Sequence, residues 1–253
     1  MRIGFLGTGE ITAAMVRGLQ GQGHQILVSP RNAQVAASLA ELPGVSIAPN
    51  DRVVAGSDVI FLCLLASVAK EILPGLPFCA DHAVISVMVD APLATLRPLC
   101  APATDIAITI PLPPIAVGGC PLPVYPDTPE LHALFGDRNL ILPQPSETAL
   151  NAHLGASALC SPILDQLLTA TDWLAGFTGN PAAAEAYIVA MIRAYLPERA
   201  AGGDLSAGLQ KLSTEGGLNA ALRAAMAPAK ADLRQGLDGF RPRLELPDTQ
   251  DRT

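Results

Sequence analysis

The first part of the chain alternates short, almost continuously apolar runs with stretches of helical periodicity. The run from Val59 to Ala66 shows the pattern most strongly, because eight successive residues are apolar. Strands of this kind, separated by helices, are typical of a parallel sheet covered on both faces. The sequence therefore predicts a doubly wound α/β sheet, with strands at 2–6, 25–29, 45–48, 58–65, 82–89 and 106–111 and helices at 11–22, 33–42 and 67–73.

The chain changes character after Thr109, where prolines become frequent. Seven prolines between residues 111 and 129 interrupt any long element, so we expect only short edge strands, at 123–125 and 140–142. From residue 146 the pattern is helical. The sequence thus predicts an α/β domain over 1–145, an all-α domain over 146–240 with helices at 146–177, 181–196, 206–211 and 218–237, and a loose tail over 241–253.

Composition narrows the class of protein. A net charge of −7 argues against nucleic acid or an anionic membrane surface as a partner. Half of the residues are apolar, which indicates buried helices or a subunit interface, but no apolar run approaches the ~20 residues that a membrane span needs. The five cysteines are scattered without metal-ligand spacing, and we expect neither a metal nor a disulfide. With no signal-peptide pattern at the N-terminus, these features favour a cytoplasmic protein.

Two glycines stand between the first strand and the first helix. Gly7 allows the tight turn, and Gly9 lets the backbone approach a pyrophosphate that then lies on the helix N-terminus. Thr12 occupies the place of a third glycine, so an ordinary glycine-rich turn is the alternative. We expect a Rossmann-type dinucleotide site, made by the Gly7 and Gly9 turn and by Thr8, Glu10, Ile11 and the two leucines that end the 58–65 strand, Leu64 and Leu65.

The end of the second strand indicates which dinucleotide is bound. In sites for NAD a carboxylate there binds the ribose 2′-hydroxyl, whereas an arginine accommodates the 2′-phosphate of NADP. This chain has no carboxylate at that point and offers Ser29, Arg31 and Asn32 as donors. The sequence therefore predicts NADP as the cofactor, unless Arg31 merely begins a solvated helix.

Several segments carry motifs that occur together in one enzyme family. They are residues 1–9 with 13–19, 29–32, 57–63 and 84–86 in the first domain, and 154–157 and 213–217 in the helical domain. With these motifs the chain resembles the pyrroline-5-carboxylate reductases, which make proline from a cyclic imine. The resemblance implies an NADPH-dependent oxidoreductase of amino-acid metabolism that transfers a hydride to a C=N bond. It also implies a homodimer formed by the helical domain, with each substrate pocket formed between parts of the two subunits.

The chain departs from the family where the substrate is bound. Ile110-Pro111-Leu112 stands in place of the family's Met-Pro-Asn, and Leu218 and Asn219 replace two threonines that follow paired glycines. The resemblance leaves Asn219, Ser157, Ser213 and Thr214 as the candidates for orienting a small imine or keto substrate. As alternatives, Ser213 and Thr214 cap the helix that begins near Gly217, and Asn219 is a helix-packing amide.

Two further functions remain open at the level of the sequence. The glycine turn is similar to that of reductases that use a deazaflavin cofactor. The loss of both threonines also permits a catalytically weak NADP-binding sensor or partner subunit.

Overall fold

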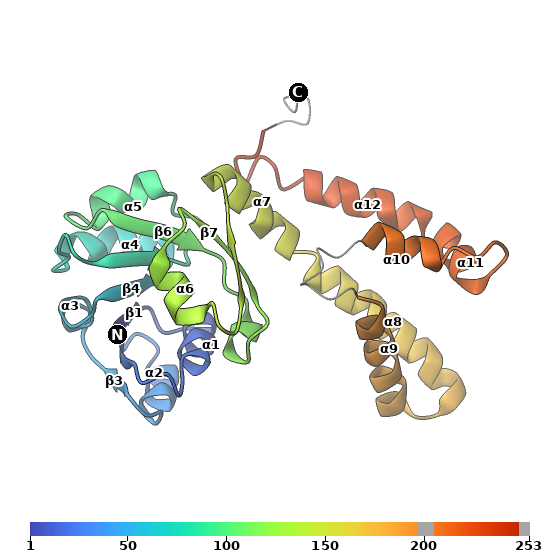
Figure 1. The fold of residues 1–253 in the computed structure, drawn as a ribbon, viewed down its shortest axis with the longest axis horizontal. Helices are drawn as coiled ribbons and strands as arrows, with labels where there is room; N and C mark the ends of the chain where they lie inside the picture. Colours follow the sequence, from blue (N-terminus) through green and yellow to red (C-terminus); the bar gives the residue numbers. More distant parts are fainter. Residues whose placement is uncertain (197–204, 248–253) are drawn as a thin grey trace. The chain divides into compact units, whose positions relative to one another are not determined.

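The computed structural model describes residues 1–196 and 205–247 and divides the chain into two compact units, Met1–Leu154 and Gly155–Thr253 (Figure 1). The division falls inside helix α7 (Glu147–Ser157), which begins one residue after the predicted start of the helical part. Each unit is described separately below.

The first unit is built on one eight-stranded sheet in the order β3-β2-β1-β4-β5-β6-β7-β8. All neighbouring strands are parallel except β6 and β7, which are antiparallel. The doubly wound sheet and the helical second part predicted from the sequence are confirmed. The strands are β1 (Arg2–Leu6), β2 (Gln25–Val28), β3 (Val45–Ile47), β4 (Val59–Leu62), β5 (Ala83–Ser86), β6 (Asp105–Thr109), β7 (Pro121–Tyr125) and β8 (Leu140–Pro143).

Alternate residues of the central strands point into two separate cores. In β4, Val59 and Phe61 belong to the core under α1 (Glu10–Gly18), α2 (Ala33–Ala40) and α6 (Pro129–Phe135). Ile60 and Leu62 belong to the core under α3 (Asn50–Ala55), α4 (Ala66–Ile72) and α5 (Leu93–Leu99). Both faces of the sheet are therefore covered, which explains why these strands are continuously apolar in the sequence.

Strand β7 was expected at the edge but lies between β6 and β8. Its two prolines are tolerated because β7 pairs with β6 over only two residues, Ile108 with Tyr125 and Thr109 with Val124. On the other side, β8 supplies the N–H groups: Leu140 donates to the carbonyl of Cys120, and Gln144 to that of Val124. A proline, which has no N–H, is tolerated in a strand where the neighbouring strand supplies the hydrogen-bond donors.

Three short helices of the first unit, α3, α5 and α6, were not expected from the sequence. Each begins at a proline, with Pro49 and Pro92 as N-caps and Pro129 in the first turn. Proline is favoured at the start of a helix because its missing N–H would have no intrahelical partner there. Pro129, which the sequence led us to interpret as a break, is therefore the start of a helix.

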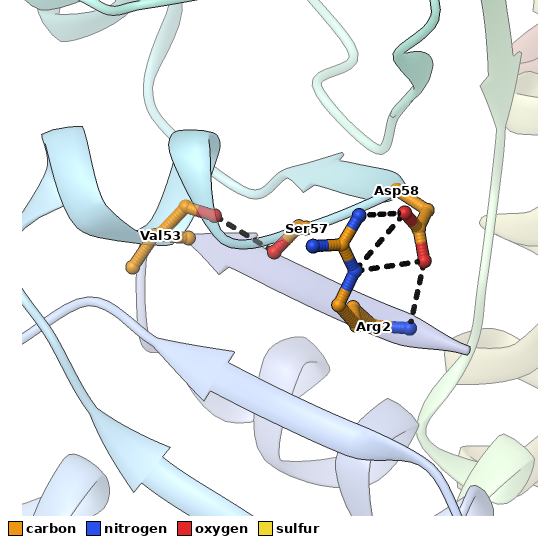
Figure 2. Close-up of polar contacts among 4 residues, drawn as sticks. All are labelled: Arg2, Val53, Ser57 and Asp58. Atoms are coloured by element: carbon orange, nitrogen blue, oxygen red, sulfur yellow. Dashed lines mark hydrogen bonds and ion pairs between the residues drawn. The ribbon is translucent and has the colours of Figure 1, made fainter.

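Helix α3 packs directly on β1, and Gly4 makes this close approach possible. A Cβ at Gly4 would lie 2.6 Å from the Oγ of Ser57, which donates a hydrogen bond of 2.7 Å to the carbonyl of Val53 (Figure 2). Beside it, Arg2 forms an ion pair with Asp58 at the amino-terminal edge of the sheet. The guanidinium holds the pKa of Asp58 below its usual value, mainly through their side-chain hydrogen bond.

The second unit consists of helices. The sequence predicted one helix over 146–177 and one over 218–237, and the structure breaks both. A proline follows each break: Pro162 cannot donate to the carbonyl of Ala158, and Pro228 cannot donate to that of Ala224. The helices are α7, which begins in the first unit, α8 (Cys160–Thr178), α9 (Pro181–Tyr195), α10 (Leu205–Lys211), α11 (Leu218–Ala225) and α12 (Ala227–Asp238).

Helices α8 and α9 form a hairpin with a well-defined turn. Gly179 ends α8 in the left-handed conformation at φ 65°, and the side chain of Asn180 caps α9 by accepting the N–H of Ala183 at 3.1 Å. Only Thr171, Ala184 and Ile188 are buried among the described residues of the second unit. The predicted tail is described as far as residue 247, and residues 248–253 lie outside the described part.

Candidate functional site

The carboxyl ends of three neighbouring strands bring the predicted cofactor residues together. Strands β2, β1 and β4 are adjacent, and they are followed by the turns at 29–32, 7–9 and 63–65 respectively. The chain reverses its direction of sheet building between β1 and β4. In doubly wound folds, ligands bind in the crevice at such a switch point.

Gly7 is required by the protein itself. Its φ of 96° lies in the region that favours glycine, and a Cβ would come within 2.1 Å of the carbonyl oxygen of Cys63. The Thr12 hydroxyl donates to the Gly7 carbonyl at 2.7 Å. The turn is thus pressed against the end of β4 and held by the first helix.

Gly9 is not required by the protein. Its backbone is extended (φ −117°, ψ −167°), and a Cβ there would meet no atom within 4 Å. Gly9 is the N-cap of α1, whose first intrahelical hydrogen bond runs from the N–H of Ala13 to the Gly9 carbonyl. The N–H groups of Glu10, Ile11 and Thr12 precede that bond, so a helix N-terminus lies beside open space. A phosphate group fits this cradle, and a side chain at residue 9 would fill it.

Ser29 is placed differently from what the sequence suggested. It is 1% exposed, and its hydroxyl accepts the N–H of Gly7 at 2.8 Å. The buried Thr8 hydroxyl donates to the Ser29 carbonyl and lies 3.3 Å from the Ser29 hydroxyl. Ser29 therefore contacts the glycine turn, and it does not reach the surface as a donor to a 2′-phosphate. Thr8 is buried in the same way, so only backbone groups of the turn can contact a ligand.

Arg31 and Asn32 are exposed at the end of β2. The Asn32 Oδ1 caps α2 by accepting the N–H of Val35 at 3.3 Å, which leaves its amide NH₂ as a donor. Arg31 has no hydrogen-bond or ion-pair partner in the described part of the chain. The two side chains and the N-terminus of α2 form a cluster of donors without a carboxylate, which fits a phosphate.

The turn after β4 carries two leucines with different exposure. Leu64 is buried, whereas Leu65 is 66% exposed and is the N-cap of α4. Cys63 precedes them, and burial raises the pKa of its thiol to about 12, against a smaller opposing effect of a hydrogen bond with Thr12. A thiol with such a pKa is protonated at neutral pH.

The candidates for substrate contact belong to the second unit or to the end of α7. Ser157 is the last residue of α7, and Thr214 and Asn219 lie on opposite sides of the Gly216-Gly217 turn between α10 and α11, both exposed. Asn219 lines a groove of about 770 Å³ together with Arg223 and Lys230. The exposure of Asn219 argues against the interpretation as a helix-packing amide.

The capping interpretation of Ser213 and Thr214 is wrong. The N-cap of α11 is Gly217, which receives no side-chain cap. The Ser213 hydroxyl instead donates back to the carbonyl of Leu209 at 2.8 Å and accepts a hydrogen bond from Arg223 at 2.8 Å. Sequence reasoning missed Arg223 as the residue that holds this turn. The sequence does show that Arg223 follows the paired glycines by six residues, one and a half helical turns along α11.

Two results concern the described residues of both units. No three metal-ligating side chains converge within residues 1–196 and 205–247. Within the same ranges, every helix is too short or too polar to cross a bilayer.

The comparison of the sequence with protein families matches residues 2–90 to a family described as "NADP oxidoreductase coenzyme F420-dependent". The matched segment covers β1 to β5 and with them the three turns described above. The comparison with curated proteins found no match.

The comparison with solved structures matches almost the entire chain to pyrroline-5-carboxylate reductases. The enzyme from Coxiella burnetii has a TM-score of 0.78 at 17% identity, and the match covers 96% of this chain and 97% of that one. The Plasmodium falciparum enzyme, solved with NADP bound, has a TM-score of 0.78 at 14% identity, covering 96% and 97%. A reductive aminase from Aspergillus terreus, in complex with NADPH4, cyclohexanone and allyl amine, has a TM-score of 0.64 at 16% identity, covering 96% and 92%. At these identities the likeness establishes the fold.

Proposed function

We propose that this chain, which has the fold of the pyrroline-5-carboxylate reductases, is an NADPH-dependent oxidoreductase that reduces a small imine. The observation that carries the proposal is that two candidate phosphate sites lie at the carboxyl ends of the adjacent strands β1 and β2. One is the open space at Gly9 beside the N-terminus of α1, and the other is Arg31, which has no partner among the described residues, beside the N-terminus of α2. A dinucleotide with a pyrophosphate and a 2′-phosphate fits both.

The residues of the first unit have distinct roles in holding the cofactor. The N–H groups of Glu10, Ile11 and Thr12 bind the pyrophosphate, while Arg31 and the Asn32 amide bind the 2′-phosphate. Leu65, exposed after β4, offers an apolar surface to the dinucleotide. Bound NADPH supplies the hydride, so the protein needs to orient the substrate and stabilise or supply one proton.

Polar side chains of the helical part are sufficient for that task. Asn219 and Thr214 carry exposed amide and hydroxyl groups, and Ser157 ends α7. The segment 146–195 contains no lysine, which disfavours the proton donor that hydroxyacid dehydrogenases of related architecture place on the corresponding helix. These features support an imine as the substrate, with Asn219 orienting it through hydrogen bonds.

The experiment that tests the function is a substrate panel. NADPH oxidation is followed with pyrroline-5-carboxylate, with bulkier and less polar cyclic imines, and with keto acids. We expect turnover of an imine, and poor activity on pyrroline-5-carboxylate because Leu112 and Leu218 replace polar residues of the family. NADPH binding without turnover of any substrate would instead favour the sensor or partner subunit.

A deazaflavin-dependent reductase is the second candidate. The description of the family matched by residues 2–90 names coenzyme F420, which is a deazaflavin. The same assay with oxidised F420 as the acceptor distinguishes the two functions. Reduction of F420 by NADPH that is faster than that of every imine would replace the first proposal with this one.

We also propose that the functional form is a homodimer in the cytoplasm. Helices α8 and α9 expose a set of large apolar side chains, and an apolar groove of about 760 Å³ lies between α8 and α12. Faces of this kind are typical of subunit interfaces. All five cysteines are free thiols, which supports a reducing compartment. The exposed residues include Leu164, Leu168, Trp173, Phe177, Tyr187 and Val189.

A further inference from the structure

Ser29 connects the two halves of the proposed cofactor site. Its backbone N–H donates to the carbonyl of Phe5 at 3.0 Å, which continues the pairing of β2 with β1. One residue beyond β1, the Gly7 N–H donates to its hydroxyl, and the Thr8 hydroxyl donates to its carbonyl. The turn that faces the pyrophosphate and the turn that carries Arg31 are therefore joined by Ser29.

The hydrogen bonds of this cluster leave neither hydroxyl group available to a ligand. The Thr8 proton goes to the Ser29 carbonyl, and the Ser29 proton has Thr8 Oγ1 at 3.3 Å as its acceptor. The Ser29 hydroxyl oxygen accepts a hydrogen bond from the Gly7 N–H. All three residues lie beneath the surface, with Thr8 and Ser29 buried, so the bonds are shielded from water.

We infer that Ser29 is a positioning residue that sets the preference for NADPH over NADH without touching the cofactor. This inference rests on the proposed NADPH-dependent function. The pyrophosphate fixes the adenosine ribose relative to the Gly7–Gly9 turn, and Arg31 must then meet the 2′-phosphate. Ser29 fixes the distance between the Gly7–Gly9 turn and Arg31. Without the Ser29 hydroxyl, the buried Gly7 N–H has no hydrogen-bond partner, and the Gly7–Gly9 turn relaxes. The contact between Arg31 and the 2′-phosphate, which NADH lacks, is then misaligned.

The test compares the Ser29→Ala variant with a matched control, Ser57→Ala. Ser57 is a buried serine at the opposite edge of the same sheet, and its hydroxyl also makes one short hydrogen bond to the backbone, at Val53 (Figure 2). Titration calorimetry measures the affinities for NADPH, NADH and adenosine 2′-monophosphate. We expect the NADPH-to-NADH affinity ratio to fall at least fivefold in Ser29→Ala and to stay unchanged in Ser57→Ala.

Adenosine 2′-monophosphate separates positioning from direct contact. It carries the 2′-phosphate but no pyrophosphate, so its affinity should change less than twofold in Ser29→Ala. An affinity ratio that is unaltered in Ser29→Ala overturns the inference, and so does an equal loss for NADPH and adenosine 2′-monophosphate. A native chain that binds no NADPH overturns the proposed function instead, and the inference with it.

A second pair of variants covers the case in which Ser29→Ala does not fold. Thr8→Val removes the hydroxyl that bonds to Ser29 with little change of shape, and Thr8→Ser retains it. The affinity ratio should fall in Thr8→Val and recover in Thr8→Ser. Equal ratios in the two variants contradict the inference.

Discussion

Gly7 and Gly9 stand two residues apart in one turn, and the structure gives each a different reason to be glycine. Gly7 has a positive φ and a carbonyl oxygen where its Cβ would be, whereas Gly9 has an extended backbone and open space. The sequence predicted both roles, because the tight turn and the phosphate approach are general properties of this motif.

Alanine substitutions separate the two roles. Gly7→Ala should lower the free energy of unfolding by more than about 2 kcal/mol, the range for a strained backbone position combined with a steric clash. Gly9→Ala should leave stability within about 0.5 kcal/mol but weaken NADPH binding at least tenfold, since the new methyl group occupies the phosphate cradle. Urea unfolding and calorimetric titration measure the two quantities. Tight NADPH binding by Gly9→Ala would contradict the proposed cradle.

Arg31 provides the direct test of cofactor choice. Arg31→Ala should remove most of the preference for NADPH over NADH, a loss of about 1.5–3 kcal/mol, as for a charged hydrogen bond. Arg17→Ala, in the last turn of α1, is the control for removing one exposed positive charge. Equal affinities of the native protein for NADPH and NADH in calorimetry would contradict the assignment of NADP.

Asn219 is the residue on which the proposed chemistry depends most. Asn219→Ala should lower turnover of the best imine substrate at least tenfold, which corresponds to about 1.4 kcal/mol of activation free energy. Its NADPH affinity should not change, because the cofactor-binding turns belong to the first unit. Gln210→Ala, an exposed polar residue on the neighbouring helix α10, is the control. Full activity of Asn219→Ala removes this residue from the site.

The sequence placed Ser29 wrongly for a physical reason. Ser29 stands at a strand end where donors to the 2′-phosphate are found, and nothing in its local pattern shows that it is buried. Its partner, the N–H of Gly7, lies 22 residues away and is brought beside it by the register of β1 with β2. Contacts between strands depend on register, which the hydrophobic pattern of one strand does not specify by itself.

At the scale of elements, the sequence located the strands better than the helices. All eight expected strands are present, and the central ones were the clearest because a strand buried on both faces has to be continuously apolar. The helices were misjudged where proline was involved, because a proline that ends one helix also occurs in the first turn of the next. Pro162 and Pro228 show this twice, each lying in the first turn of the helix that follows the break.

The turn before β5 contains a pH-sensitive contact. Nδ1 of the buried His82 accepts the N–H of Cys79 at 3.1 Å, which requires that nitrogen to be unprotonated. Desolvation lowers the pKa of His82, and the weaker influences of Asp58 and Asp81 oppose this shift. Because the folded pKa lies below the unfolded value of about 6.5, the folded protein binds fewer protons. The contribution of His82 to stability is complete above about pH 6.5 and is lost as the pH falls.

His82→Asn should reduce this pH dependence, because the Asn Oδ1 keeps an acceptor near the position of Nδ1 and does not titrate. Urea midpoints measured from pH 7 down to about pH 5 should decline less in His82→Asn than in the native chain. His153→Asn, at an exposed histidine of α7, should behave like the native protein. Identical slopes in all three proteins would exclude His82 as the cause.

At the scale of the whole molecule, the prediction concerns assembly. The exposed apolar side chains of α8 and α9 should associate with a second copy, so sedimentation at micromolar concentration should give a dimer. Leu164→Glu and Phe177→Glu should each shift the protein to a monomer, whereas Glu185→Gln on the same hairpin should not. A native monomer under these conditions contradicts the prediction. The sequence indicated this interface through its apolar content alone, without showing which side chains would be exposed.

Trp173 gives the molecule an optical label on one element. It is the only tryptophan of the chain, lies 68% exposed on α8, and has its ring centroid 5.0 Å from that of Phe177. Tryptophan emission therefore follows α8 alone, whereas circular dichroism follows the secondary structure of both units. During chemical unfolding, the two signals coincide if the units unfold as one and separate if the α8–α9 hairpin melts first.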